Sequence, residues 1–261
     1  MQFEDILYEK KEGIATITIN RAKVYNAFRS QTIAELIAAF EDAEDDQSVG
    51  VVVLTGAGDR AFCSGGDVAE MGDLSPQSGQ RFTKEVMRLI LAIRGTGKPV
   101  IARVNGYCLG GGNELNLACD LTIASENSRF GQVGPIVGSV PIMEGTQMLP
   151  RLVGEKKARE IIFLCQQYTA HEAAEMGWIN KVVPQDELDE EVDRWCKRIL
   201  ELSPQALRIA KTSLNFESDM LYPSLVHGRQ MLCQIYGGEE IKEGMNAFLE
   251  KRQADFGKFR K

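Results

Sequence analysis

Two glycine-rich stretches constrain this chain most, because each directly follows an apolar run rich in β-branched residues. One stretch is residues 62–67 (FCSGGD), after the run at residues 49–54, and the other is residues 105–114 (NGYCLGGGNE), after the run at residues 100–104. Continuous runs of this kind are typical of buried strands. Glycine at a strand end permits a tight turn and a close approach of the backbone to a ligand. We therefore expect two strand ends that present backbone to a binding site.

The rest of the chain alternates strand and helix patterns. Residues 3–20 alternate around a polar Lys-Lys-Glu-Gly turn and predict a hairpin. Apolar residues recur at helical spacing in residues 30–40 and 82–93, and Ser30 is expected to cap the first of these helices. This order favours an α/β fold with parallel strands. Further helices are expected at residues 186–201, 204–216, 223–236 and 239–253.

The expected domain organisation follows from the same pattern. No Gly/Ser/Pro-rich linker divides the chain, and the sequence has no evident repeat of 20–50 residues. All elements expected after about residue 200 are helices. We therefore expect a core at residues 1–200 followed by a C-terminal helical region at residues 201–261.

Composition limits the classes of partner. The chain has 30 basic and 37 acidic residues, for a formal net charge of −7, which disfavours a general affinity for nucleic acid or an anionic membrane. A local basic patch for an anionic ligand is still compatible with this charge. The N-terminus carries no basic-then-apolar signal segment, and no apolar run has the length needed to span a bilayer. We expect a cytoplasmic protein with neither nucleic acid nor membrane as partner.

Cysteine and histidine usage argues against metal and thiol chemistry. The six cysteines are scattered without C-x-x-C spacing, which predicts reduced, buried thiols. Cys63 and Cys108 flank the glycine turns and are expected to pack rather than to attack a substrate. His171 and His227 lie far apart without metal-ligand spacing, so neither a zinc site nor a His-based triad is expected.

The two glycine turns together suggest an oxyanion hole. Two such turns could aim two backbone N–H groups at one carbonyl oxygen and so stabilise negative charge that develops there. The second turn leads directly into Glu114, on a segment at residues 114–119 that is expected to start a helix. A hole beside a proton-transfer group suits chemistry next to a thioester carbonyl. The alternative for Glu114 is a helix-start carboxylate stabilised by the helix dipole.

A series of short motifs runs in a fixed order along almost the whole chain, and this order resembles the enoyl-CoA hydratase/isomerase, or crotonase, superfamily. The resemblance implies a spiral of ββα turns with a C-terminal helical region used in trimer contacts. It also implies CoA-thioester substrates, a homotrimer or dimer of trimers, and no redox cofactor or required metal. The motifs are INRAK at 19–23 with Asn26-Ala27, AFCSGGD at 61–67, KPVIA at 98–102, NGY at 105–107, Glu114-Leu115, Cys119-Asp120, FGQ at 130–132, GTQ at 145–147, and Ala173-Ala174 with Gly177.

Carried over by position, the resemblance implies roles for individual residues. The N–H groups of Gly66 and Gly111 would form the oxyanion hole. Asp67 is expected to cap the following turn or helix rather than to react. The implied substrate contacts are Arg21, Ala22 and Lys23 near the CoA phosphates or adenine, together with Ser64, Gly65, Asp67, Gly110 and Gly134.

The carboxylates depart from the hydratase pattern. Hydratases of this superfamily use two glutamates, one that holds water and one that delivers a proton. Glu114 falls on the first position, but the chain has Gly134 at the second. Glu144, in an apolar loop, is the candidate for a second catalytic carboxylate, and an exposed loop residue is the alternative. If Glu144 is buried near Glu114, desolvation and like charge should raise one of the two pKa values.

Gly134-Pro135 instead resembles a ring-handling branch, 1,4-dihydroxy-2-naphthoyl-CoA synthase and 2-ketocyclohexanecarboxyl-CoA hydrolase. Tyr236 falls where that branch carries a functional tyrosine, and a packed aromatic side chain is the alternative. In some synthases of the branch this glycine leaves room for a bicarbonate that acts as base, so bicarbonate is a candidate ligand at Gly134. Pro141, Glu144 and Glu114 all depart from the residues that the branch carries at these positions.

The sequence therefore favours an acyl-CoA enzyme that stabilises an enolate. The expected reaction is hydration or isomerisation of an enoyl-CoA, including one with a cyclic or branched acyl group. The alternatives are a ring-forming or ring-cleaving acyl-CoA enzyme, a non-catalytic homologue that binds CoA or a partner, and a moonlighting RNA binder. The carboxylate at Glu114 disfavours a non-catalytic role, and the net charge disfavours RNA binding.

Overall fold

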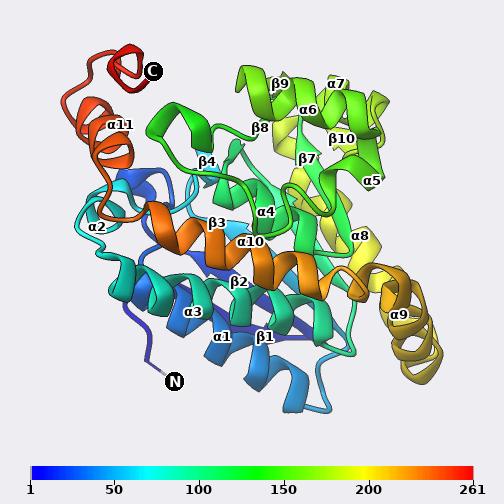
Figure 1. Cartoon of the computed structure of the whole chain (residues 1–261). Helices are drawn as coiled ribbons and strands as arrows, with labels where there is room; N and C mark the ends of the chain where they lie inside the picture. The colour runs from blue at the N-terminus through cyan, green and yellow to red at the C-terminus, as the bar shows by residue number, and fades with distance from the viewer. Residues whose placement is uncertain (1, 261) are drawn as a thin grey trace.

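The computed structural model describes residues 2–260 (Figure 1). Its larger sheet has six strands and lies between layers of helices. Antiparallel pairing joins the first two strands as a hairpin, and every later neighbour pairs in parallel. The expected hairpin and the expected α/β fold with parallel strands are therefore confirmed. In spatial order the strands are β1 (Ile6–Lys11), β2 (Ile14–Ile19), β3 (Val51–Gly56), β5 (Val100–Val104), β7 (Leu121–Ser125) and β10 (Lys181–Val183).

A smaller four-stranded sheet lies above the first. Its strands, in spatial order, are β4 (Ala61–Cys63), β6 (Tyr107–Leu109), β8 (Arg129–Gly131) and β9 (Tyr168–Thr169). Strands β4, β6 and β8 are parallel, and each follows a strand of the larger sheet along the chain. The chain therefore repeats a unit of two strands and a helical segment. The glycines of the two stretches follow the short strands β4 and β6 rather than the long strands that the sequence predicted before them. The sequence did not indicate β4 and β6, because three residues are too few to show alternation.

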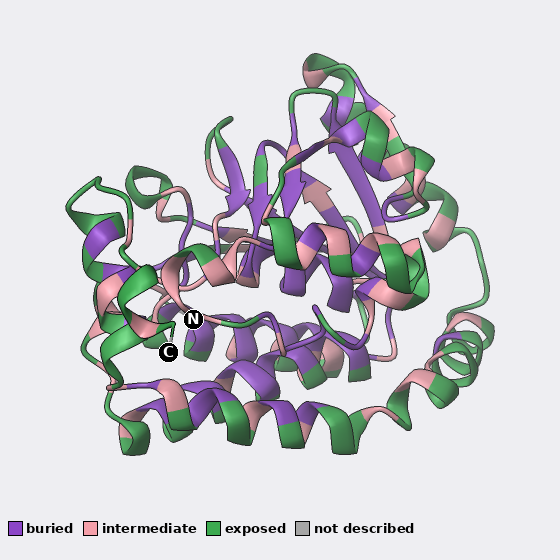
Figure 2. Ribbon diagram, turned by 45° about the horizontal axis from the view of Figure 1, so that its top comes forward, coloured by how far each residue is buried: buried purple, intermediate pink, exposed green. Residues whose placement is uncertain are grey.

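The larger sheet is covered by helices on both faces, which explains why β3 is buried along its whole length. Val52 and Leu54 pack with the core that includes α1 (Ser30–Asp45) and α3 (Pro76–Gly95). Val51 and Val53 point to the opposite face and pack against α8 (Leu188–Leu200). Figure 2 shows the central strands buried, while the helices expose one side to solvent, and the edge strand β1 is largely exposed.

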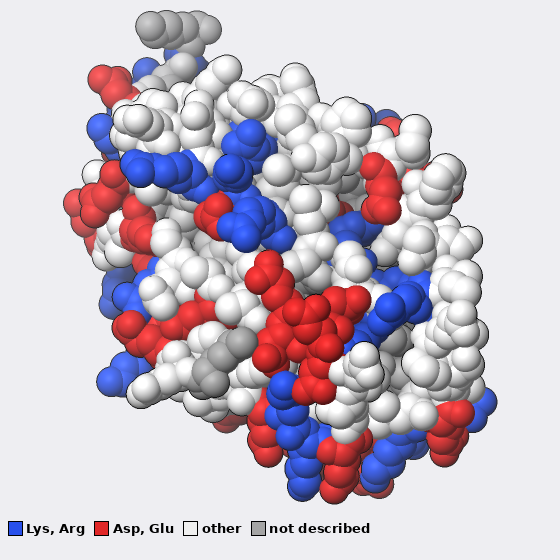
Figure 3. Space-filling model, turned by 90° about the horizontal axis from the view of Figure 1, so that it is seen from below, with Lys and Arg blue, Asp and Glu red and all other residues white. Residues whose placement is uncertain are grey.

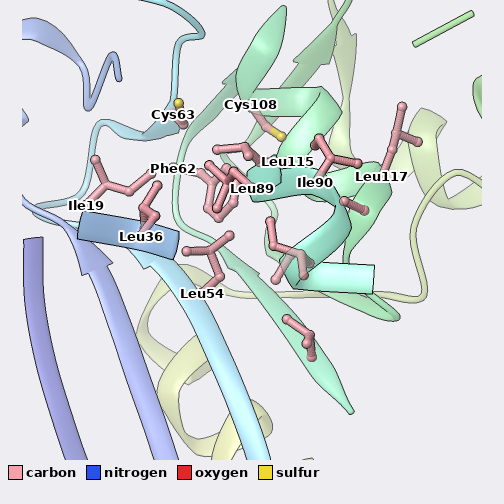
Figure 4. Packing of buried hydrophobic residues seen from close by; sticks show 14 of the residues in the cluster. Ile19, Leu36, Leu54, Phe62, Cys63, Leu89, Ile90, Cys108, Leu115 and Leu117 are labelled. Atoms are coloured by element: carbon pink, nitrogen blue, oxygen red, sulfur yellow. The ribbon is translucent and has the colours of Figure 1, made fainter. Parts of the chain in front are cut away.

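The core continues directly beneath the glycine turns (Figure 4). Phe62 of β4 and Leu115 of α4 (Gly111–Ala118) are buried within it. Cys63 and Cys108 are also fully buried, as expected. Burial raises the pKa of the Cys63 thiol to about 12, so this thiol stays protonated at neutral pH. The base of each glycine turn is therefore anchored by apolar packing.

The remaining helical segments follow the expected order with small shifts. Helix α1 begins at Ser30, so Arg29 rather than Ser30 is its N-cap, and the Arg29 N–H donates to the Thr32 hydroxyl. No helix within residues 2–260 is long and apolar enough to cross a membrane. The other segments are η1 (Ala22–Val24), α2 (Val68–Gly72), η2 (Gly134–Val137), α5 (Leu149–Val153), α6 (Glu155–Leu164), α7 (Ala170–Glu175), η3 (Gln185–Glu187), α9 (Pro204–Asp219), α10 (Tyr222–Ile235), α11 (Glu239–Leu249) and η4 (Gly257–Phe259).

Candidate active site

The two glycine turns lie against each other. An added Cβ at Gly65 would come within 3.1 Å of the Gly111 nitrogen, and Gly65 has a positive φ of 109°. An added Cβ at Gly111 would approach the Phe28 ring to 2.7 Å. Only glycine fits these positions without movement of the neighbours, which gives the local reason for both glycine stretches.

Two backbone N–H groups at this junction have no protein acceptor. Among residues 2–260, neither the Gly66 nor the Gly111 N–H donates a hydrogen bond. Gly111 is the first residue of α4, where N–H groups lack intrahelical partners and carry the positive end of the helix dipole. Asp67 accepts from the Ala69 N–H and caps α2, as expected, while Arg21 Nη1 lies 2.9 Å from its carboxylate.

Both glycine turns line a cavity of about 640 Å³ between the small sheet, α3 and the C-terminal helices. Of the residues singled out in the sequence, its wall includes Ser64, Gly65, Gly66, Asp67, Gly110, Gly111, Glu114, Gly134, Tyr236 and Lys23. The wall is largely apolar away from Glu114, with Met71, Phe82, Val86, Val137 and Leu232. Sequence reasoning did not single out this apolar set, because its members come from segments far apart in the chain.

Glu114 lies in the first turn of α4, with 8% of its surface exposed. Its Oε1 accepts a hydrogen bond from the Met143 N–H at 2.7 Å and from the Gly145 N–H at 3.3 Å. Burial raises the pKa of Glu114 to about 8, and the charge of Glu144 acts in the same direction, against the two N–H donors. The group can therefore hold or release a proton near neutral pH.

Glu144 is in the same loop, between the two residues whose N–H groups bind Glu114, but it does not line the cavity. It is 1% exposed, so it is not the exposed loop residue that was the alternative. Its Oε1 is 4.0 Å from Nε of Arg94. Burial raises the pKa of Glu144 to about 7 despite the opposing effect of Arg94.

Tyr236 follows α10 and lines the cavity with 1% of its surface exposed. Its ring packs on Gly79 of α3, where an added Cβ would come within 2.5 Å of the ring. Burial is the main cause of the raised pKa of Tyr236, and the charges of Cys233 and Glu114 add to it. The phenol is therefore a neutral hydrogen-bond donor at the pH at which Glu114 titrates.

Gln132 is a further polar group in the cavity wall, and in the sequence it is recognisable only as part of the FGQ motif. The side chain is fully buried, and neither of its polar atoms has a partner within residues 2–260. Its Nε2 lies near Gly145, which donates to Glu114. Buried amides are normally paired, so this one is suited to bind a polar ligand.

The three residues expected near the CoA phosphates, Arg21, Ala22 and Lys23, do not all lie at the cavity. Lys23 lines the cavity and forms no ion pair within residues 2–260, whereas neither Arg21 nor Ala22 is in the lining. The Arg21 guanidinium is engaged by Asp67 at 2.9 Å and lies 3.6 Å from Asp5. Figure 3 shows clusters of basic side chains beside a cluster of acidic ones on one face of the molecule. A net charge of −7 is therefore compatible with local positive charge.

Solved structures of similar proteins have the same fold. An enoyl-CoA hydratase from Mycobacterium avium subsp. paratuberculosis K-10 is 28% identical, with a TM-score of 0.88 over 98% of this chain and 99% of that one. An enoyl-CoA hydratase/isomerase from Xanthobacter autotrophicus Py2 is 32% identical, with a TM-score of 0.88 over 98% of this chain and 99% of that one. An enoyl-CoA hydratase from Bacillus anthracis is 30% identical, with a TM-score of 0.80 over 96% and 98%.

The sequence comparison agrees with the structural one. A family model described as enoyl-CoA hydratase/isomerase matches residues 9–259, which is nearly the whole chain. The motifs that carried the resemblance are therefore part of an alignment that extends through both sheets and the C-terminal helices. The chain belongs to the enoyl-CoA hydratase/isomerase family and has the crotonase fold.

Proposed function

We propose that this protein hydrates or isomerises an enoyl-CoA, with Glu114 as its proton-transfer group. The observation that carries the proposal is the presence of two unpaired N–H groups and a carboxyl with a raised pKa in the wall of one cavity. The N–H groups of Gly66 and Gly111 would bind the thioester oxygen. Their hydrogen bonds strengthen as negative charge develops on that oxygen, which is how an oxyanion hole lowers a barrier.

A single carboxylate can complete either reaction. In hydration, ionised Glu114 takes a proton from water as the water oxygen bonds to the β-carbon, and the electron pair of the double bond forms the enolate. Glu114 then returns the proton to the α-carbon, so one water is added in total. In isomerisation, Glu114 moves a proton between two carbons of the acyl chain. Both routes start from the ionised carboxylate, so the rate should rise with pH towards about 8.

The walls of the cavity support the choice of substrate. Phe82, Val86 and Leu232 offer an apolar surface for the acyl group. Lys23 supports a role in binding the anionic CoA moiety, because its charge is not engaged by a carboxylate within residues 2–260. The unpaired amide of Gln132 supports the presence of a polar group, water or substrate, next to Glu114.

The test is mass spectrometry of a panel of linear enoyl-, cyclic enoyl- and 2-ketocyclic acyl-CoAs, incubated in heavy water with the wild type and Glu114→Gln. A product one water heavier, or an isomer that has taken up deuterium, supports the proposal if it is lost in the variant. Turnover that survives in folded Glu114→Gln would remove Glu114 from the chemistry. No change with any substrate would argue for a binding protein.

Ring formation or cleavage of a cyclic acyl-CoA is the second candidate, favoured by the positions of Gly134 and Tyr236 in the same cavity wall. An added Cβ at Gly134 would come within 3.2 Å of the Ser139 carbonyl oxygen, so this position favours glycine. Ring opening or closure that survives Glu114→Gln, and that responds to added bicarbonate, would support this candidate over the first.

Self-assembly through the C-terminal helices is part of the proposal. Helix α9 exposes large apolar side chains, including Leu214 (81% exposed) and Phe216, and Met220 directly after the helix is also exposed. Exposed apolar clusters of this kind mark contact surfaces. Sedimentation should give the mass of a trimer or a dimer of trimers, and a monomer at micromolar concentration would contradict this assembly.

A further inference from the structure

The backbone at Glu144 has a conformation that favours glycine. Its φ is 90°, a region that side chains with a Cβ rarely adopt, yet Glu144 is almost fully buried. Such residues persist only where the surrounding structure holds them, and they are frequent at functional sites. Local preference alone therefore does not explain a glutamate at this position.

The contacts of the Glu144 carboxylate also do not show a close ion pair that would account for a buried glutamate. Oε2 has no partner within residues 2–260, and Oε1 is 4.0 Å from Nε of Arg94. The Arg94 guanidinium is shared, because its Nη2 donates to Ser218 at 2.7 Å and to Asp219 at 3.0 Å. A buried carboxylate with one long, shared ion pair is destabilising relative to a neutral residue.

The link from Glu144 to the cavity runs through its two chain neighbours. The N–H groups of Met143 and Gly145 both donate to Oε1 of Glu114. The loop is held by a hydrogen bond from the Thr146 N–H to the Pro141 carbonyl, and the Met148 N–H donates to the carbonyl of Glu144 itself. The turn at Glu144 therefore orients both donors.

We propose that Glu144 is a positioning residue that acts through Glu114: its turn orients the two N–H donors that bind the Glu114 carboxyl, and its carboxylate places a buried negative charge on the same loop. The proposal rests on the proposed function of Glu114. It differs from the role of a second catalytic carboxylate, because Glu144 does not line the cavity. A substrate bound there would contact Glu114 and not Glu144.

The charged and titratable groups around the pair set the expected behaviour. Glu114 interacts with Glu144, and it in turn affects Tyr236. Glu144 interacts with Arg94, which favours its ionisation, and with Asp219, which opposes it. Oε1 of Glu144 lies 4.0 Å from Nε of Arg94, whereas no cation within residues 2–260 pairs with Glu114. Glu144 therefore ionises first, and its charge then opposes loss of the second proton.

The experiment compares Glu144→Gln with the wild type in two ways. One is the pH dependence of kcat/KM. The other is the pH midpoint at which the infrared band of the Glu114 carboxyl disappears, a band that is identified by its absence in Glu114→Gln. Glutamine keeps the shape and removes the charge, so the Glu114 midpoint should fall by about one pH unit. The activity between about pH 7 and 8, where Glu144 is ionised in the wild type, should then rise in Glu144→Gln. A second catalytic carboxylate predicts the opposite, a loss of activity at every pH.

Two further variants keep the test decisive. If Glu144→Gln does not fold, Glu144→Gly replaces it, since glycine adopts a φ of 90° without strain. Glu217→Gln is the matched control, because it removes one exposed negative charge that pairs with Arg151 outside this cluster. An unchanged Glu114 midpoint in the folded variant, or an equal shift in Glu217→Gln, would overturn the proposal.

The infrared midpoint also separates the two proposals. It reports the coupling of Glu144 to Glu114 whether or not any enoyl-CoA is turned over. A shifted midpoint in a protein that turns over no acyl-CoA would support the coupling and contradict the proposed function. A normal turnover with an unshifted midpoint would do the reverse.

Discussion

The glycine turns and the loop around Glu144 both bring backbone N–H groups to the cavity, but they do so by different means. In the turns, glycine provides the conformation, and the apolar core beneath them provides the rigidity. In the loop, a buried glutamate has a positive φ and adds a charge next to the N–H groups that it orients. The comparison teaches that a conformation typical of glycine can be occupied by a charged residue where that charge has a use.

The largest expected effect tests the turns. Gly111→Pro removes one of the two N–H groups at the first helical position, where proline fits the helix backbone. Its Cβ also displaces the Phe28 ring, as the Cβ of any other residue here would. Loss of one oxyanion donor should lower kcat by about 10²–10³-fold. Steady-state kinetics on the substrate found in the panel measures this loss.

Its control is Gly111→Ala, which adds the same Cβ beside Phe28 but keeps the N–H group. Circular dichroism and thermal unfolding should show that Gly111→Pro is folded despite the nearby Phe28 ring. Normal turnover in folded Gly111→Pro would contradict the role of the Gly111 N–H.

The second effect concerns the carboxyl shared by both regions. The folded pKa of Glu114, about 8, lies above its usual value of 4.5, so the folded state holds a proton that the unfolded chain releases. The free energy of unfolding should therefore fall as pH rises from about 4.5 to 8, by up to about 1.4 kcal/mol per pH unit. Urea unfolding at several pH values should show a shallower decrease in Glu114→Gln, and equal slopes would disagree with a raised pKa.

A smaller effect tests the loop. Glu144→Gly relieves the positive φ and removes a buried charge with an unpaired oxygen. The variant should gain about 1–3 kcal/mol in the free energy of unfolding at pH 8, where Glu144 is ionised. Urea unfolding measures this gain, and a large loss of stability would mean that the Arg94 contact stabilises the loop.

The smallest effect sharpens the description of the first turn. Asp67→Asn keeps a good N-cap for α2 but weakens the contact with Arg21. Stability should fall by about 1 kcal/mol, because the ion pair is partly buried, with 16% of each side chain exposed. Asp67→Ala, which also removes the cap, should cost more, and equal losses in the two variants would assign the whole effect to the ion pair.

Several features were predictable from sequence because their causes are local. The hairpin and the strand at residues 100–104 follow from alternation and an apolar run, and the strand predicted at residues 49–54 lies two residues later, at Val51–Gly56. The short strands β4 and β6 were missed, because three residues carry too little pattern. The N-cap of α1 was placed one residue late, because Thr32 rather than Ser30 makes the capping hydrogen bond.

The sequence by itself determined the alternating α/β fold, the two glycine turns and the location of Glu114 at a helix start. Tertiary structure alone decided which groups meet. It brings the loop of Met143 and Gly145 onto Glu114, turns Arg21 towards Asp67, and buries Glu144 behind the cavity wall. The physical reason is that backbone preferences act over a few neighbouring residues, whereas desolvation and charge depend on residues that are distant in the chain.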